Sequence, residues 1–196
     1  MITDMHDIIM FSKEFLLHPT TVSSIVPSSK ALSSTIIDKA NLKNAKVIFE
    51  LGCGSGAITR DIVSNLSDGA VFIAFDTNQT FTKIVKRKYP GVIVINDFAE
   101  NVEKYMKQYS IDKADVIISS LPWAAFSHVA QSRLLRIIYR ILNPGGSFLT
   151  YIYLHTFVFP SQNRFRKILN RKFKTINISN AVWANLPPAA VIRCIR

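Results

Sequence analysis

The chain has 196 residues, the size of one domain with one sizeable core, and 48% of them are hydrophobic, as is usual for a globular protein. It contains no run of about eighteen apolar residues for a bilayer span, and its first residues, with Asp4 and Asp7, lack the basic start of a secretory signal. Cys53 and Cys194 are too few for a disulfide framework and suggest no metal site. We therefore expect one cytoplasmic domain, a monomer without a bound metal.

The net charge of +11 is distributed unevenly along the chain. All 13 acidic residues lie at or before Asp115, together with 13 of the 24 lysines and arginines. The later part of the chain carries the other 11 basic residues without a compensating acid: Arg133, Arg136, Arg140, Arg164, Arg166, Lys167, Arg171, Lys172, Lys174, Arg193 and Arg196. This asymmetry predicts a polyanionic partner, either an anionic membrane surface or nucleic acid. A basic face that only solvent covers is the alternative.

Two helices are predicted before the first strand. Apolar residues recur at helical spacing between Met5 and Leu16, and His18-Pro19 ends that helix. Such an amphipathic helix packs on the core, covers a ligand as a lid, or lies on a membrane surface. The second helix opens at Pro27-Ser28-Ser29, where serine is an N-cap, and runs through Ala40. The N-terminus of this second helix is a potential anion site.

The most informative stretch reads Val47-Ile48-Phe49-Glu50-Leu51-Gly52-Cys53-Gly54-Ser55-Gly56-Ala57-Ile58-Thr59. A short apolar run, three closely spaced glycines and then apolar residues at helical spacing predict a strand, a tight turn and a helix. Glycines in such a turn let a nucleoside approach the backbone, and they adopt backbone angles that other residues avoid. A strand-to-helix turn without a ligand is the alternative.

Glu50 separates two classes of cofactor that use this turn. The spacing of Gly52, Gly54 and Ala57 also fits the dinucleotide fingerprint G-x-G-x-x-G/A. A carboxylate at the end of an apolar strand, however, needs a cationic or hydrogen-bonding partner, and it would repel a pyrophosphate. S-adenosylmethionine brings an ammonium and a sulfonium instead. The run therefore resembles motif I of the class I methyltransferases, E/D-x-G-x-G-x-G; a partly exposed acid at a strand end is the simpler alternative.

Two further predicted strands lead into acids. Residues 70–76 read as a buried parallel strand that ends in Asp76, about twenty residues beyond the glycines, where such folds use an acid to bind ribose hydroxyls. The strand at 92–95 leads into Asn96-Asp97-Phe98. By resemblance to methyltransferases, Asp97 and Phe98 hold the amino group and the ring face of adenine. A helix cap for Asp97 and a core position for Phe98 are the alternatives.

The second half of the chain completes the sheet. The fourth strand, 115–120, runs into Leu121-Pro122-Trp123, and substrate chemistry is expected at the carboxyl ends of such central strands. The turn Asn143-Pro144-Gly145-Gly146 leads into the fifth strand, 147–153. Two further strands are predicted over 173–180 and 189–195. Helices are predicted over 99–109, 128–142 and 162–171.

Seven strands that alternate with helices predict an α/β fold. We expect a Rossmann-like, seven-stranded and mostly parallel sheet with helices on both faces and an antiparallel pair at its end. The single domain at 1–196 would consist of an N-terminal helical cap at 1–42, acting as a lid, and a catalytic α/β core at 43–196.

Several stretches together resemble one group, the bacterial phospholipid N-methyltransferases, which are related to the ribosomal RNA adenine dimethylases. They are Phe15-Leu16-Leu17-His18-Pro19, Ser24-Ile25-Val26-Pro27-Ser28-Ser29, motif I, Ser120-Leu121-Pro122, Pro144-Gly145-Gly146 and Trp183-Ala184-Asn185-Leu186-Pro187-Pro188-Ala189. The I-V-P-S-S and N-L-P-P-A pieces are the more discriminating, because motif I is shared by a very large superfamily. The resemblance implies stepwise methyl transfer from S-adenosylmethionine to the amine of phosphatidylethanolamine at a membrane face.

The resemblance and the chemistry together give three groups of candidate site residues. The cofactor-binding group is Glu50, Gly52, Cys53, Gly54, Gly56, Asp76, Thr77, Asp97, Phe98, Ser119 and Leu121. The catalytic group is Ser120, Trp123, Tyr151 and Tyr153, of which the three aromatic residues would form a wall for a partly methylated ammonium or else belong to the core or its rim. The group for a lipid phosphate is Ser28, Ser29, Lys30, His155 and Arg193.

Departures from known patterns keep other substrates open. Enzymes acting on planar exocyclic amines carry an N/D-P-P-Y/F/W tetrad, and Ser120-Leu121-Pro122-Trp123 lacks its Asn or Asp, which counts against adenine. The first helix of the lipid enzymes is cationic, whereas the acids Asp4, Asp7 and Glu14 outnumber Lys13 here, so we expect membrane attachment on the basic C-terminal part. Trp123 and Leu154-His155 also differ from the commonest family pattern. An RNA adenine N-methyltransferase and a methyltransferase of a soluble amine remain the alternatives.

Overall fold

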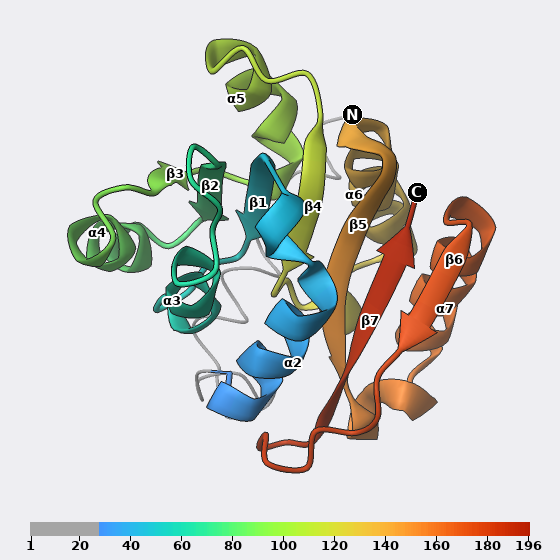
Figure 1. Cartoon of the computed structure of the whole chain (residues 1–196). Coiled ribbons are helices and arrows are strands. Elements are labelled where there is room, and N and C mark those ends of the chain that lie inside the picture. The colour runs from blue at the N-terminus through green and yellow to red at the C-terminus, as the bar shows by residue number, and fades with distance from the viewer. Residues whose placement is uncertain (1–27) are drawn as a thin grey trace.

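The computed structural model describes residues 28–196, so the predicted first helix and most of the predicted cap lie outside the described part. The described chain forms one seven-stranded sheet in the order β3-β2-β1-β4-β5-β7-β6 (Figure 1). Its strands are β1 (Val47–Leu51), β2 (Val71–Asp76), β3 (Ile93–Asn96), β4 (Ala114–Ser119), β5 (Leu142–Tyr153), β6 (Thr175–Ile178) and β7 (Ala189–Ile195). The first five pair in parallel, and β7 runs antiparallel to both β5 and β6. The predicted Rossmann-like sheet with its antiparallel end is confirmed.

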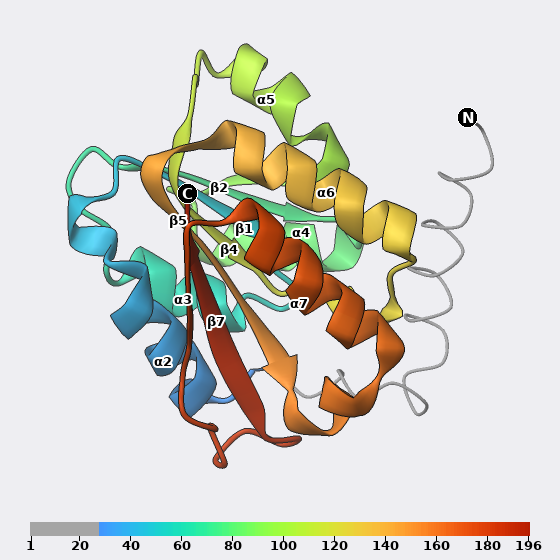
Figure 2. The same cartoon turned by 90° about the vertical axis from the view of Figure 1, so that its right-hand side faces the viewer.

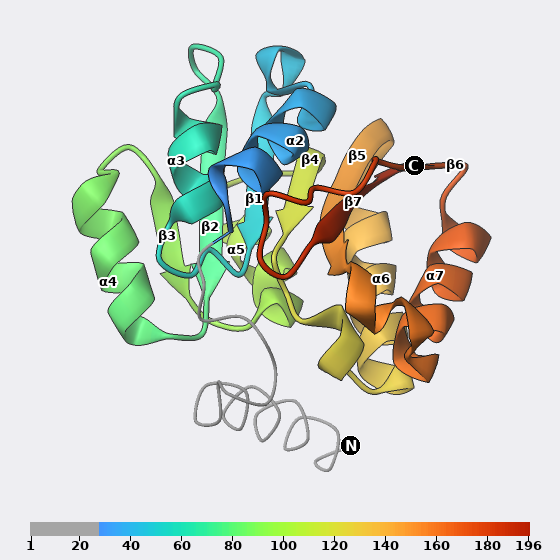
Figure 3. The same cartoon turned by 90° about the horizontal axis from the view of Figure 1, so that it is seen from below.

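Helices cover both faces of this sheet, and Figure 3 shows α2 and α3 on one face and α6 and α7 on the other. The helices are α2 (Lys30–Ala40), α3 (Ala57–Val63), α4 (Gln79–Lys88), α5 (Val102–Gln108), α6 (His128–Ile141) and α7 (Pro160–Lys172), with 3₁₀ turns η1 (Leu42–Asn44), η2 (Ala99–Asn101), η3 (Trp123–Ala125) and η4 (Leu154–Val158). Two apolar cores result, one under α2 and α3 and one under α5, α6 and α7. The central strands are almost wholly apolar because both of their faces are covered. Within residues 28–196, no helix has the length and apolar character that crossing a membrane requires.

The structure differs from the sequence-based prediction at β5, which begins at Leu142 and not at 147. The predicted turn at Asn143-Pro144-Gly145-Gly146 is part of the strand because its backbone finds partners on two sides. Leu142 pairs with Ala114 of β4, and the amide of Gly145 donates to the carbonyl of Arg196. Gly145 takes a φ of 79°, which only glycine adopts readily.

The parallel strands end at one rim of the sheet, which we call the carboxyl edge; the opposite rim is the amino edge. The glycine turn after β1, the loops after β2 and β4, and η4 after β5 all leave from the carboxyl edge. The start of α2 and the connection between β6 and β7, residues 179–188, lie at the same edge, at the bottom of Figure 1. Ligands of open α/β sheets bind at this edge, so it is where the candidate site is expected.

Candidate active site

The glycine turn is fastened to the end of β2. The amides of Gly52 and Cys53 both donate to the carbonyl of Phe75, at 2.8 and 2.9 Å. The amide of Gly54 donates to Oδ2 of Asp76 at 2.8 Å. Two sequence-predicted cofactor residues, Gly54 and Asp76, are therefore brought into direct contact across neighbouring strands.

The glycines also leave room above the turn. Gly52, Gly54 and Gly56 have φ values of 84°, 49° and 86°, in the region that favours glycine. A Cβ added at Gly54 would meet no atom within 4 Å, whereas one at Gly52 would lie 3.2 Å from Leu121 Cδ2. The turn is thus closed against the protein at Gly52 and open to a ligand at Gly54, and Leu121 lies beside it as predicted.

Glu50 is the decisive residue of this site. Its side chain is fully buried, Oε2 accepts a hydrogen bond from the Thr59 hydroxyl at 2.7 Å, and Oε1 has no hydrogen-bond partner within residues 28–196. Burial raises the pKa of the Glu50 carboxyl to about 8, and the nearby Asp76 carboxylate adds to the rise that the Thr59 bond opposes. An unpartnered buried carboxyl oxygen calls for a cationic ligand. The residues present therefore fit a cofactor with a positively charged amino acid portion.

Asp76 is the second acid of the site. We call Glu50, the glycine turn and Asp76 together the cofactor cradle. Its Oδ1 accepts from the Asn78 amide at 2.8 Å, in addition to the Gly54 bond on Oδ2. Burial raises the pKa of Asp76 above its ordinary value despite these backbone bonds. Thr77, the next residue, is exposed beside it.

Cys53, between these two acids, is buried in the turn. Burial first, and then the negative charges of Glu50 and Asp76, raise the pKa of the Cys53 thiol. A thiol held in its protonated form is a poor nucleophile, so Cys53 shapes the cradle and does not react. Among the described residues, no His, Cys, Asp and Glu side chains gather in a group that could hold a metal ion.

Asp97 follows β3 and organises the segment after it. It accepts hydrogen bonds from the Phe98 amide, the Asn101 side chain and the Tyr105 hydroxyl, each at 2.8 Å. Burial alone would raise the pKa of Asp97, but these hydrogen bonds outweigh it and hold the pKa below its ordinary value. The helix-capping alternative is not borne out, because the N-caps of η2 and α5 are Phe98 and Asn101 and neither helix start receives a side-chain cap bond. Contact of Asp97 and half-buried Phe98 with adenine stays a prediction.

The loop after β4 corrects one catalytic assignment. Trp123 is 1% exposed, its ring stacks on Phe165 at 4.6 Å between centroids, and its indole N–H donates to the Ser119 hydroxyl. Contrary to the sequence-based prediction, Trp123 belongs to the core under α7 and cannot line an open substrate wall. Ser119 is fully buried as its partner. Ser120 stays near the glycine turn, because its amide donates to the carbonyl of Leu51 at 2.9 Å.

The two tyrosines do form an aromatic row, and a histidine extends it. Tyr151 and Tyr153 meet edge to face at 5.6 Å, and Tyr153 stacks on His155 at 5.7 Å. Burial, with the neighbouring Tyr151, raises the pKa of the Tyr153 phenol, so its phenolate is not available near neutral pH. Both tyrosines pack beside Leu149 on the sheet face that also carries Glu50.

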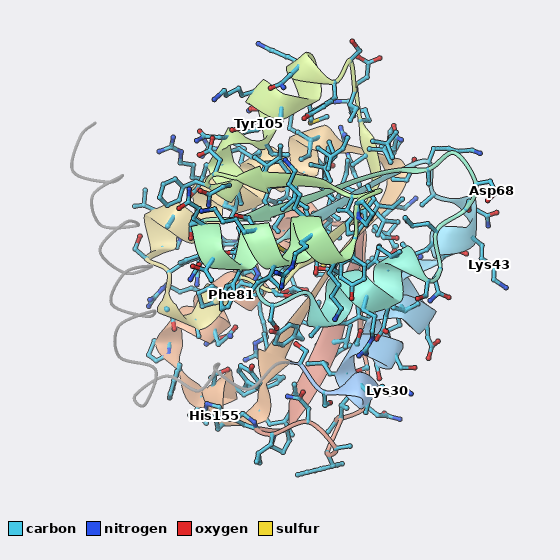
Figure 4. The ribbon with its side chains drawn as sticks, turned by 90° about the vertical axis from the view of Figure 1, so that its left-hand side faces the viewer. Lys30, Lys43, Asp68, Phe81, Tyr105 and His155 are labelled. Carbon is cyan, nitrogen blue, oxygen red and sulfur yellow. The ribbon has the colours of Figure 1, made fainter. Side chains whose placement is uncertain are left out.

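The proposed phosphate residues divide between the two edges. Ser29 is the N-cap of α2, and its hydroxyl accepts a hydrogen bond from the Leu32 amide. Ser28 precedes it, and the exposed Lys30 is the first residue of the helix. Figure 4 shows Lys30 and His155 at the same lower edge of the molecule. Arg193 lies elsewhere: it pairs with Leu149 and Asn177 inside the sheet and donates to the Ser147 hydroxyl towards the amino edge. The prediction that Arg193 binds the substrate phosphate is therefore wrong.

Two residues of the site were not predicted. Within the described residues, Thr59 supplies the only hydrogen bond to the Glu50 side chain. Its signal in the sequence was a hydroxyl residue next to Ile58 at the start of an otherwise apolar helix face. Asn185 is 3% exposed and accepts from the Ser29 amide at 2.9 Å. The signal for Asn185 was a polar residue ahead of Leu-Pro-Pro, but its distant partner could not be read from the sequence.

Comparison with known proteins assigns the fold and cofactor. A family model described as a methyltransferase domain matches residues 49–150, just over half of the chain. The chain belongs to this methyltransferase domain family. The match includes the glycine turn, Glu50, Asp76 and Asp97, and it identifies the chain as a class I methyltransferase that uses S-adenosylmethionine.

Individual relatives agree with this family. The methyltransferase is 29% identical over 147 residues to an ornithine lipid N-methyltransferase of Singulisphaera acidiphila, covering 74% of this chain and 77% of that protein. It is 27% identical over 100 residues to ribosomal RNA small subunit methyltransferase H of Clostridium botulinum, covering 50% of this chain and 32% of that protein. The fold matches an O-methyltransferase of Bacillus cereus in complex with SAH, with a TM-score of 0.70, 10% identity, and coverage of 95% of this chain and 90% of that chain.

Proposed function

We propose that this methyltransferase acts at a membrane surface and methylates the amine of phosphatidylethanolamine and of its methylated derivatives, towards phosphatidylcholine. The observation that carries the proposal is the row of Tyr151, Tyr153 and His155 beside an acidic cofactor cradle. Glu50 is level with Ile118 and Leu149 on neighbouring strands, and Tyr151 is one side-chain step nearer the carboxyl edge than Leu149. The strand β1, which carries Glu50, and the strand β5, which carries Tyr151, are two strand spacings apart, or roughly 10 Å.

The residues divide the chemistry among them. S-adenosylmethionine, when bound, supplies a methyl group on a positively charged sulfur. Glu50 and Asp76 bind and orient the cationic and ribose portions, and the open face of Gly54 admits the nucleoside. The ring faces of Tyr151 and Tyr153 attract the ammonium of the acceptor, and this attraction persists as methyl groups replace its hydrogens. Proton removal falls to exposed His155 or to water, because the Tyr153 phenolate is not accessible near neutral pH.

The lipid headgroup needs an anion site near the amine site. At the N-terminus of α2, Ser28 and Lys30 supply a hydroxyl and a positive charge at the carboxyl edge. The Ser29 amide is already bound to Asn185, and its hydroxyl to the Leu32 amide. The basic C-terminal part would hold the protein to an anionic inner membrane face from the cytoplasm. The relative that methylates an ornithine lipid supports a lipid substrate, since ornithine and ethanolamine both carry a primary amine.

The test is a transfer assay with methyl-labelled S-adenosylmethionine. The protein is incubated separately with vesicles containing phosphatidylethanolamine and phosphatidylglycerol, with vesicles containing an ornithine lipid, and with total RNA. We expect label in phosphatidylethanolamine. Label in the ornithine lipid alone would assign the ornithine headgroup as substrate in place of ethanolamine. Label in neither lipid would reject the proposal.

RNA is the second candidate, favoured by the uncompensated basic residues and by the similarity to a ribosomal RNA methyltransferase. The absence of Asn or Asp from Ser120-Leu121-Pro122-Trp123 counts against adenine as acceptor. Label found only in the RNA arm of the assay would replace the lipid by RNA.

A further inference from the structure

Four large apolar side chains project into solvent at the carboxyl edge. Val158 and Phe159, at the end of η4, are 82% and 44% exposed, and Trp183 and Leu186, in the β6–β7 connection, are 74% and 75% exposed. Single exposed apolar residues are common on soluble proteins, but a group of large ones at one end marks an interaction surface.

The two segments that carry these residues are neighbours. The amide of Leu154, which starts η4, donates to the carbonyl of Pro188 at 2.9 Å, and Tyr153 pairs with Ala189. Figure 2 shows η4 and the β6–β7 connection at the same end of the β5–β7 ladder. The four apolar side chains thus flank the end of the row formed by Tyr151, Tyr153 and His155. We call these four residues the apolar rim.

The connection presents its two apolar residues from a folded loop. Asn185, between Trp183 and Leu186, is buried and joins the loop to the Ser29 amide of α2. Its side-chain amide also donates to the carbonyl of Pro187 at 2.7 Å, and Val182 bridges to Ala189. Because the backbone is held on both sides, the outward direction of Trp183 and Leu186 is fixed by the fold and ordering them on a partner loses little entropy.

The charge around the rim selects the partner. Arg164 and Lys167 are exposed on α7, which begins directly after Phe159, and Lys30 is exposed at the start of α2. No acidic residue occurs after Asp115. A surface that accepts large apolar groups and attracts cations is that of an anionic bilayer, where Trp prefers the boundary between headgroups and acyl chains. A second copy of this chain would bring like charges together, since the net charge is +11.

We propose that the apolar rim enters an anionic lipid bilayer and sets the protein with its carboxyl edge facing the membrane. The proposal rests on the lipid methyltransferase function for its purpose. In this orientation a lipid amine reaches the tyrosine row without leaving the bilayer.

Trp183 allows a direct test, because the chain has only two tryptophans and Trp123 is buried. Fluorescence is recorded with phosphatidylglycerol–phosphatidylcholine vesicles, which contain no primary amine substrate, and with lipids brominated near the headgroup or near the chain end. We expect a blue shift on binding and stronger quenching by the shallow bromines. Trp183→Phe should abolish both the blue shift and the quenching, while the variant protein still sediments with the vesicles.

A double variant keeps the reporter and removes part of the rim. Val158→Asp with Leu186→Asp should weaken vesicle binding at least tenfold and leave S-adenosylmethionine affinity and the melting temperature unchanged, since both side chains are exposed. Tyr109→Asp, at the end of α5 on the amino edge, exchanges one partly exposed aromatic residue for one negative charge, so it is the control for the single variants Val158→Asp and Leu186→Asp measured in parallel. It should bind vesicles almost as well as wild type.

The outcomes separate the two proposals. Sedimentation with vesicles without quenching of Trp183 would overturn the rim and leave lipid methylation standing. A blue shift without lipid, together with dimers in analytical ultracentrifugation, would also overturn it and assign the rim to a second copy. Quenching of Trp183 by shallow bromines, with no label in any lipid in the transfer assay, would support the rim and reject the proposed substrate.

Discussion

Glu50 is predicted to bind the cofactor, and its burial gives that binding a pH response. Its pKa of about 8 means that the free protein holds a proton there at neutral pH, whereas a bound ammonium favours the carboxylate. Glu50→Gln should therefore weaken S-adenosylmethionine binding roughly 10- to 100-fold, the effect of losing one buried charged hydrogen bond. Calorimetry at pH 7 in two buffers of different ionisation enthalpy should show that wild type releases about one proton more on binding than the variant. Equal proton release would contradict the ligand role of Glu50.

The same carboxyl should lower the stability of the unliganded protein as pH rises. Its pKa is raised on folding from 4.5 to about 8, so between these values the folded state holds a proton that the unfolded state has lost. Stability from this group is complete below the lower value and is lost as pH rises to the upper one. Glu50→Gln should thus gain stability over wild type by about 1 kcal/mol for each pH unit between roughly pH 5 and 8, measured by urea unfolding. Parallel stability curves would disprove this.

The side chains also show how far a single residue could be interpreted from sequence. Glu50 and the glycines were predictable because a charge in an apolar strand and closely spaced glycines each have a local physical reason. Trp123 was not, because its environment is set by Phe165 of α7 and by Ser119, and nothing in the sequence near Trp123 indicates that α7 covers it. The prediction for Arg193 was wrong for a similar reason, since the position of Arg193 between the two edges of the sheet follows from the register of β7 against β5.

At the level of elements, Asp115 joins three strands at the amino edge. Its carboxylate accepts from the amide of Lys46 just before β1, from the amide of Val47, the first residue of β1, and from the Asn143 side chain in β5, at 2.7 to 3.0 Å. Asp115→Ala should lower the free energy of unfolding by roughly 2–3 kcal/mol, because three donors lose their acceptor. Chemical denaturation measures it, and Asp112→Ala, an exposed acid in the preceding loop, is the control with little expected change.

The pH dependence of that loss follows from the direction of the pKa shift. Burial alone would raise the pKa of Asp115, but the hydrogen bonds from Lys46, Asn143 and Val47 hold this pKa below its ordinary value. Its stabilisation is therefore present above the unfolded pKa and disappears as pH falls through the folded one. The difference between wild type and Asp115→Ala should shrink below about pH 4. A difference that stays constant down to pH 3 would reject this account.

The order of the elements was predictable because apolar runs mark the strands and helices of this chain, and glycines and prolines mark the turns between them. Element ends were less so: β5 starts at Leu142 because the distant Arg196 and Ala114 pair with its first residues. The turn η4 was missed because Leu154 to Val158 carries neither a strand nor a helix pattern, although it supports half of the apolar rim.

For the whole molecule, charge should govern membrane affinity while the cofactor cradle stays independent of it. Arg164→Glu with Lys167→Glu should weaken binding to phosphatidylglycerol vesicles roughly 10- to 100-fold, since each basic residue near an anionic surface contributes about 1 kcal/mol. Sedimentation at several salt concentrations should show a smaller salt effect for the variant.

The matched control makes the same charge change on another helix. Lys86→Glu with Arg87→Glu lies in the last exposed turn of α4, towards the amino edge, and should change vesicle binding much less. Equal losses in both variants would mean that net charge alone, and not its position on α7, drives the association.

The antiparallel course of β7 has a practical consequence for studying this enzyme in cells. Because β7 returns along β5, Arg196 pairs with Gly145 and Gly146, and the C mark in the upper half of Figure 1 lies away from the β6–β7 connection at the bottom. If the apolar rim binds a bilayer as proposed, a fluorescent protein attached at Arg196 would extend into the aqueous phase, whereas one inserted between β6 and β7 would lie against the lipid. Imaging with the fusion at Arg196 would thus report where the enzyme resides without covering the carboxyl edge.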